Sequence, residues 1–210
     1  MQFRTGAIGL LLAALATSTA NAQGPDETAL ASKLKHGGYV IVMRHAHAQD
    51  VPPGSAEADS ADRNHERQLD AAGRTSASAM GAAIRALTVP IGAVWVCPTY
   101  RARETVRLAG LRGPRVAAEL GDNGRSMQAA NNGQAAWLRA LANERPRPGT
   151  DTIIVTQYPN ISAAFGDAAV GMKDGEALVF RPSGKAEPQE VGRIAIEQWP
   201  LLALQQKHQK

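Results

Sequence analysis

Continuous apolar runs alternate with spaced apolar positions along most of the chain. Three short apolar runs, at residues 39–43, 93–97 and 152–156, predict buried strands. Between them, apolar residues recur at intervals of three and four, which predicts amphipathic helices. These helices are expected at residues 27–35, 70–89, 101–110 and 134–143. The pattern predicts an α/β fold, a three-layer sandwich in which helices flank a mostly parallel central sheet.

Two further apolar runs lie near the C-terminus, at residues 177–180 and 191–196. A Pro-Ser-Gly-Lys turn separates them, so we expect two more strands at an edge of the sheet. Asp70 is a candidate N-cap for the second helix, and Pro90 would end that helix. The polar segment 51–64 is expected to be a mobile loop.

The N-terminus has the pattern of a secretory signal peptide. One positive charge, a short apolar run and the small-x-small triplet at residues 20–22 predict cleavage before Gln23. We therefore expect residues 1–22 to be a signal peptide, residues 23–210 to form a single domain, and the protein to be exported, either periplasmic or secreted. The only cysteine, Cys97, has no partner for a disulfide.

Composition narrows the class of ligand. The chain has 23 Lys and Arg against 19 Asp and Glu, with a formal net charge of +4 and only 4% aromatic residues. A mildly basic balance is compatible with a small anionic substrate, and the scarcity of aromatic residues disfavours a nucleic-acid platform. No segment after the signal peptide is apolar enough to span a membrane. No pattern in the sequence indicates an oligomeric state.

Polar residues follow each of the three central strands. Arg44 and His45 follow the first run, Arg101 comes shortly after the second, and Gln157 directly after the third. Because ligands bind outside the carboxyl ends of the strands in open α/β sheets, we expect these side chains to meet at one edge.

One hypothesis for the polar residues that follow the first apolar run is a metal site. His45 and His47, with Asp50, are ligand types that suit zinc. The later strands are not followed by further histidines, and Arg44 places a cation where a metal would bind. We therefore predict no metal and no cofactor, and metal-dependent hydrolysis is the least favoured reading.

A phosphoryl site uses more of the same residues. A neutral imidazole at a strand end can attack phosphorus, and guanidinium groups can hold the equatorial oxygens. We therefore predict His45 as the nucleophile, with Arg44 and Arg101 binding the phosphoryl group. Arg101 would also lie at the start of a helix, where free backbone N–H groups favour an anion.

Three motifs in order resemble the histidine phosphatase superfamily, which includes phosphoglycerate mutases and phosphohistidine phosphatases. They are MRHA, VWVCPTYRARET and IIVTQYPNI, and the family patterns are strand-RHG, strand-SPxxRAxET and strand-x-His. The segments GEALVFRP and IEQWP resemble the ends of small exported members. The resemblance covers nearly all of the chain after the signal peptide, and it implies a phosphoglycerate mutase-like fold and a phosphohistidine intermediate.

The resemblance also implies roles for individual residues. Arg67 falls near a position where the family often has another polar or basic contact. The family's proton donor is usually a carboxylate after the RAxET helix, which points to Glu119, with Glu176 as the reserve. Gln157 stands where the family has its second histidine, and it can donate only a neutral hydrogen bond. Ala46 replaces the common glycine, which requires a backbone without positive φ.

Two functions remain open at this point. The first is a metal-independent phosphomonoester hydrolase, weakened by Gln157, that acts on a small anionic phosphorylated substrate. The alternative is a catalytically inactive family member that binds a phosphorylated ligand or a protein partner. Retention of Arg44, His45 and Arg101 favours the first hypothesis, and Gln157 favours the second.

Overall fold

The computed structural model describes residues 25–50, 66–121, 132–184 and 187–208. The predicted signal peptide and the predicted loop at 51–64 lie outside the described residues. The described helices are α1 (Pro25–Leu34), α2 (Ala71–Ala86), α3 (Tyr100–Leu108), α4 (Asn132–Ala142), α5 (Tyr158–Phe165) and α6 (Gln198–His208), with short 3-10 turns η1 (Ala118–Leu120) and η2 (Gly166–Ala169). The strands are β1 (Val40–Arg44), β2 (Ile91–Val96), β3 (Arg115–Val116), β4 (Asp151–Thr156), β5 (Ala177–Arg181) and β6 (Gln189–Ile194).

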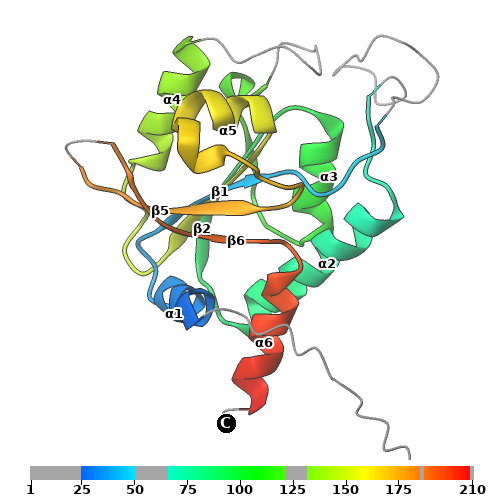
Figure 1. The fold of residues 1–210 in the computed structure, drawn as a ribbon, viewed down its shortest axis with the longest axis vertical. Coiled ribbons are helices and arrows are strands. Elements are labelled where there is room, and N and C mark those ends of the chain that lie inside the picture. The colour runs from blue at the N-terminus through cyan, green and yellow to red at the C-terminus, as the bar shows by residue number, and fades with distance from the viewer. Residues whose placement is uncertain (1–24, 51–65, 122–131, 185–186, 209–210) are drawn as a thin grey trace, which may run out of the picture.

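One six-stranded sheet, in the order β3-β2-β4-β1-β5-β6, lies at the centre of the fold (Figure 1). Strands β1 to β4 are parallel, whereas β5 runs antiparallel to both of its neighbours, β1 and β6. The register pairs Arg44 with Thr156 and Val96 with Val155. The carboxyl ends of β1, β2 and β4 are therefore neighbours, and the residues that follow them are brought to one edge, as the sequence predicted.

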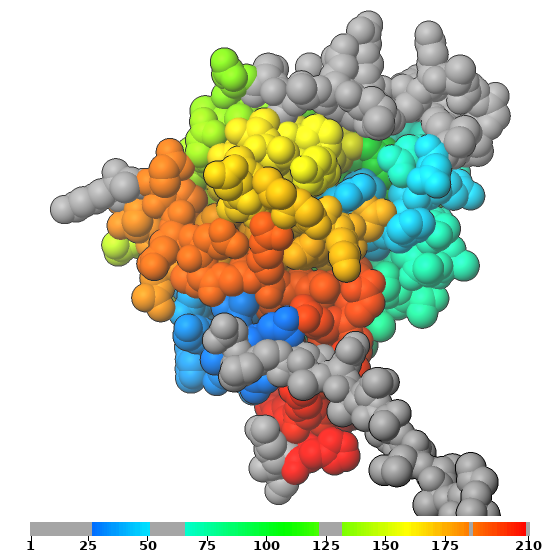
Figure 2. Space-filling view, viewed as in Figure 1, coloured from blue at the N-terminus to red at the C-terminus, as the bar shows by residue number. Residues whose placement is uncertain are grey.

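Helices cover the sheet on both faces, with α4 and α5 on one side and α2 and α6 on the other (Figure 1). The chain from α5 to α6 forms most of the face seen in Figure 2. Apolar side chains from both layers pack on the sheet, and the whole of β4 is buried. In the described part of the chain, no helix is both long enough and apolar enough to cross a bilayer.

The N-cap predicted at Asp70 is confirmed, because its carboxylate accepts a hydrogen bond of 2.7 Å from the backbone N–H of Gly73. The strands predicted near the C-terminus are confirmed as β5 and β6. However, β5 lies inside the sheet, between β1 and β6, and of these two strands only β6 is at an edge, opposite the edge formed by β3. Ala46 is compatible with its position, since Thr88 alone has a positive φ among the described residues other than glycine.

Helix α6 was not predicted, because its apolar residues do not follow one helical face and Pro200 stands in its first turn. It is nevertheless held in place by Trp199 and Leu202, which are buried. After β4, Gln157 holds the N-cap position of α5, and Asn160 lies inside the helix, where its side-chain amide donates to the carbonyl of Leu120 and to the hydroxyl of Thr156.

Candidate functional site

His45 directly follows β1 and is only 2% exposed. Its backbone N–H donates to the carbonyl of Thr156 (3.0 Å), which ties it to the end of β4. The ring atom Nδ1 lies 2.8 Å from the carbonyl oxygen of Ala46, and Nε2 accepts a hydrogen bond of 3.0 Å from Nε of Arg101. A carbonyl can only accept, so this network assigns the ring proton to Nδ1 and leaves the lone pair on Nε2.

The pKa of His45 lies well below its usual value of 6.5. Burial is the main cause, because it disfavours the charged imidazolium, and the positive charge of Arg101 is the second. Arg44 and Arg67 lower the pKa further, while the hydrogen bond to Ala46 opposes the shift. His45 is therefore a neutral imidazole at pH 7, which is the form that can act as a nucleophile.

Arg101 lies in the first turn of α3 and is only 1% exposed. Besides its bond to His45, it donates from Nη2 to the side-chain oxygen of Gln157. The burial of the guanidinium confirms that Arg101 is no solvated surface arginine. Its position, between two side chains that follow β1 and β4, brings the ends of three strands together.

Glu66 is a site residue that the sequence analysis missed. It is 1% exposed, its Oε2 accepts from the backbone N–H of Tyr100 at 2.5 Å, and the same oxygen lies 4.0 Å from Nη1 of Arg101. A carboxylate at a helix N-terminus is stabilised by the helix dipole, here by that of α3. Its position just before Arg67 in a polar loop carries no periodicity, so no local signal could have identified it.

Gln157 occupies the N-cap position of α5 without a side-chain capping bond, and it is buried. Its side-chain oxygen accepts from Arg101, and its amide Nε2 lies 3.5 Å from Sγ of Cys97. In this structure the side-chain oxygen of Gln157 therefore orients Arg101, and the predicted role of its amide as a donor to a phosphoryl group stays a prediction. Cys97 is the buried residue we expected, and burial raises the pKa of its thiol.

Arg44 is partly buried at the end of β1. Its guanidinium forms an ion pair of 2.5 Å with Asp174, donates to the carbonyl of Met172 (3.3 Å), and lies 5.7 Å from the centre of the Tyr158 ring. Asp174 is a second residue that the sequence analysis missed. It belongs to the loop before β5, so the antiparallel part of the sheet also contributes to the site.

Arg67 is half-buried, and its Nε donates to the carbonyl of Gln49 at 2.5 Å. Its effect on the pKa of His45 is consistent with the expected proximity to the site. His47 is exposed: its Nδ1 lies 2.8 Å from Asp70, and its Nε2 lies 3.9 Å from Asp174. It is thus held between two carboxylates.

The two candidate proton donors lie in different surroundings. Glu119 is exposed on η1, next to Leu120, whose carbonyl accepts from the hydroxyl of Thr156 at 2.9 Å. Glu176 is held by the backbone N–H of Lys173 (2.8 Å) and lies 3.6 Å from Arg193. Of the carboxylates that the structure describes, Glu66 is the one seen in contact with Arg101.

Among the described residues, no group of three His, Cys, Asp or Glu side chains is placed to hold a metal ion. His45 and His47, the pair considered for zinc, make their contacts with different partners. The residues that surround His45 offer guanidinium groups, a neutral amide and a lone pair. The guanidinium and amide groups of such a set can bind the oxygens of a phosphoryl group, and the lone pair can attack its phosphorus.

Solved structures with similar folds include the protein histidine phosphatase SixA complexed with tungstate, at 20% identity and a TM-score of 0.54, covering 76% of this chain and 98% of that one. They also include phosphoserine phosphatase from Entamoeba histolytica in complex with 3-phosphoglyceric acid, at 12% identity and a TM-score of 0.51, covering 75% of this chain and 96% of that one. The chain has the phosphoglycerate mutase-like fold. No family model and no curated protein matches the chain by sequence.

Proposed function

We propose that the protein is a metal-independent phosphomonoester hydrolase that acts through a phosphohistidine on His45, with activity weakened at Gln157. The observation that carries this proposal is the buried, neutral His45, whose Nε2 lone pair faces the guanidinium of Arg101 at 3.0 Å. Tungstate, which is bound in the similar SixA structure, is a tetrahedral oxyanion like phosphate. This supports a small phosphorylated substrate as the ligand.

The reaction would proceed in two displacements. Nε2 of His45 attacks phosphorus in line, the bond from phosphorus to the leaving oxygen breaks, and a carboxylic acid protonates that oxygen. We assign this proton donor to Glu119, on η1. Water then attacks the phosphohistidine, the carboxylate takes a proton from this water, the P–N bond breaks, and inorganic phosphate leaves with His45 and the carboxylic acid restored. Arg44 and Arg101 would bind the equatorial oxygens, supported by the charge of Arg67.

Gln157 would limit the rate. A neutral amide donates a weaker hydrogen bond to a phosphoryl oxygen than an imidazolium does. The loss of a charge-assisted bond of about 1.5 to 3 kcal/mol, felt only in the transition state, slows the reaction roughly ten- to a hundred-fold. In addition, Gln157 accepts from Arg101 through its oxygen, so its amide has to reorient before it donates to a substrate.

The test is hydrolysis of p-nitrophenyl phosphate by residues 23–210, in the presence of EDTA, from pH 4.5 to 7.5. We expect slow turnover that His45→Ala abolishes and Gln157→His raises at least tenfold. Turnover that EDTA removes would instead support metal-dependent hydrolysis. If the native protein and Gln157→His are both inactive, the hydrolase proposal fails for this class of substrate.

The second candidate function is binding of a phosphorylated ligand without turnover. The observation that favours it is the arrangement of Arg101, whose guanidinium is already hydrogen-bonded to His45 and Gln157. Calorimetric titration with tungstate separates the two functions. Binding together with the absence of turnover in both the native protein and Gln157→His would establish the binding role.

We also propose that the protein is exported after removal of residues 1–22. The charged, apolar and small-residue regions of this segment support the proposal. Mass spectrometry of the protein recovered from the exported fraction should find Gln23 at the N-terminus. An intact Met1 in that fraction would contradict cleavage.

A further inference from the structure

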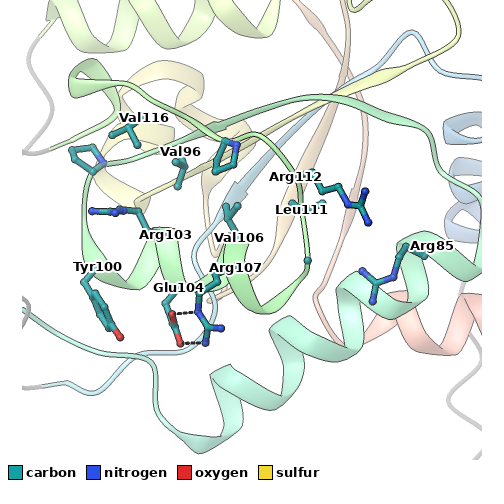
Figure 3. A pocket seen from close by; sticks show the side chains of 13 residues that line it. Arg85, Val96, Tyr100, Arg103, Glu104, Val106, Arg107, Leu111, Arg112 and Val116 are labelled. Carbon is teal, nitrogen blue, oxygen red and sulfur yellow. Dashed lines mark hydrogen bonds and ion pairs between the residues drawn. The ribbon is translucent and has the colours of Figure 1, made fainter.

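A groove of about 1130 Å³ lies along the outside of α3, between this helix, the end of α2 and the segment that leads into β3 (Figure 3). It does not include His45. The groove and the site are joined by one turn, because Pro98 and Tyr100 line the groove while Arg101, the next residue, points to His45. No step of the proposed hydrolysis uses the groove.

The groove carries an excess of positive charge. Its lining includes the four arginines Arg85, Arg103, Arg107 and Arg112, and a single carboxylate, Glu104. Figure 3 shows their guanidinium groups distributed along the groove, so that the charge is not confined to one end.

The carboxylate is already neutralised. Glu104 accepts two hydrogen bonds of 2.7 Å from Arg107 and lies 3.2 Å from Arg74. The side chains of Arg103 and Arg112 are exposed, and neither guanidinium has a hydrogen bond or an ion pair within the part of the chain that the structure describes. These two arginines are therefore available to an incoming anionic group, which would gain charge-assisted hydrogen bonds.

Apolar side chains lie between the charges. Val96 and Val106 are buried beneath the groove, whereas Val116 on β3 is 55% exposed and Leu111 is partly buried. Strand β3 is the edge of the sheet and pairs with β2 alone. An edge strand presents backbone groups to an extended chain.

We propose that this groove docks an acidic, extended segment of a protein partner, in which carboxylates alternate with apolar side chains. The carboxylates would pair with Arg103 and Arg112, and the apolar side chains would cover Val116. A bilayer of anionic lipids fits less well, because the cations line a concave surface that a flat membrane cannot follow. The proposal is independent of the phosphatase activity, since binding is measured directly.

The probe is a fluorescein-labelled peptide of sequence EVEVELEV, whose anisotropy is followed on titration with residues 23–210 in 50 mM NaCl. We expect saturable binding that Arg103→Glu and Arg112→Glu each weaken at least tenfold, and the double variant more. Arg145→Glu is the matched control. It makes the same charge change at an exposed arginine in the turn before β4, outside the groove, and should leave the affinity within about twofold of the native value.

Further measurements distinguish an acidic peptide from other ligands of the groove. A peptide with lysine in place of glutamate should not bind, and Val116→Ser should weaken binding without a change in net charge. Inorganic phosphate at 5 mM should leave peptide binding unchanged, because phosphate is expected to bind at the His45 site and not in the groove. The proposal is overturned if Arg145→Glu weakens binding as much as Arg103→Glu, if phosphate displaces the peptide, or if vesicles of 25% phosphatidylglycerol in phosphatidylcholine bind while the peptide does not.

Discussion

Nε of Arg101 donates a hydrogen bond of 3.0 Å to Nε2 of His45, the atom proposed to attack phosphorus. The same contact lowers the pKa of His45 and holds its lone pair toward the start of α3. In the proposed reaction, a phosphoryl group that enters the site would replace this interaction. Arg101 thus lowers the pKa of His45 and orients its ring, and under the proposal it would also bind the substrate.

Removal of the Arg101 charge should raise the pKa of His45. Arg101 is the second largest cause of the lowered value, after burial, so Arg101→Gln is expected to move the pKa upward toward 6.5. The ring resonances of His45 in NMR spectra recorded from pH 3 to 8 measure this shift. The neutral imidazole is the reactive form, so the acid limb of kcat/KM should move to higher pH by the same amount. Arg145→Gln is the control, and an unchanged His45 titration in Arg101→Gln would contradict the assignment.

Replacement of Glu66 should strengthen oxyanion binding. The Glu66 carboxylate competes for the charge of Arg101 at 4.0 Å in a buried setting, so Glu66→Gln is expected to tighten tungstate binding about tenfold, equivalent to ~1.4 kcal/mol. Glutamine can still accept from the N–H of Tyr100, which limits the loss of stability. Calorimetry with tungstate measures the effect, and Glu187→Gln, at an exposed carboxylate, is the control. An unchanged or weaker affinity in Glu66→Gln would show that Glu66 does not compete with the ligand.

Thr105 should position the backbone next to the nucleophile. Its hydroxyl accepts from the N–H of Ala46 (3.1 Å) and donates to the carbonyl of Arg101 (2.8 Å), and it is fully buried. Thr105→Val leaves a buried N–H without an acceptor, so unfolding in urea should show a loss of about 1 to 3 kcal/mol. Activity should fall more in kcat than in KM. Thr75→Val, at an exposed threonine of α2, should change neither quantity appreciably.

Asp151 should make the folded state less stable as the pH rises from 4 to 7. Burial raises the pKa of Asp151 to about 7, against an ordinary value near 3.9 in the unfolded chain. Between these values the folded state binds more protons than the unfolded state, so stability falls with rising pH by on the order of 1 kcal/mol per pH unit and levels off above pH 7.

Asp151→Asn tests this directly. Asparagine can still accept from the N–H of Tyr39, the 2.9 Å hydrogen bond of the native carboxylate, but it does not titrate. Urea unfolding at pH 5, 6, 7 and 8 should show a smaller decline in the variant than in the native protein, and the variant should be the more stable at pH 8. If the free energy of unfolding changes with pH in the same way in both proteins, Asp151 does not have a raised pKa.

The sequence by itself determined the central strands of the sheet and the residues that meet at their carboxyl ends. The apolar runs that became β1 and β4 are buried on both faces, and the run that became β2 is partly buried, so local composition identifies all three. Parallel strands end on the same edge, and for that reason the positions of His45, Arg101 and Gln157 in the chain were enough to predict that they meet. Contacts that depend only on strand order and strand ends can be read from the pattern.

Only the tertiary structure decided which partners those residues have. Glu66 approaches Arg101 from a loop, and Asp174 pairs with Arg44 across 130 residues of chain, so neither contact leaves a local pattern. The acceptor role of Gln157 and the groove beside α3 depend likewise on segments that meet only after folding. Periodicity records what each segment buries against the core, but it carries no information about which polar groups satisfy one another when distant segments pack.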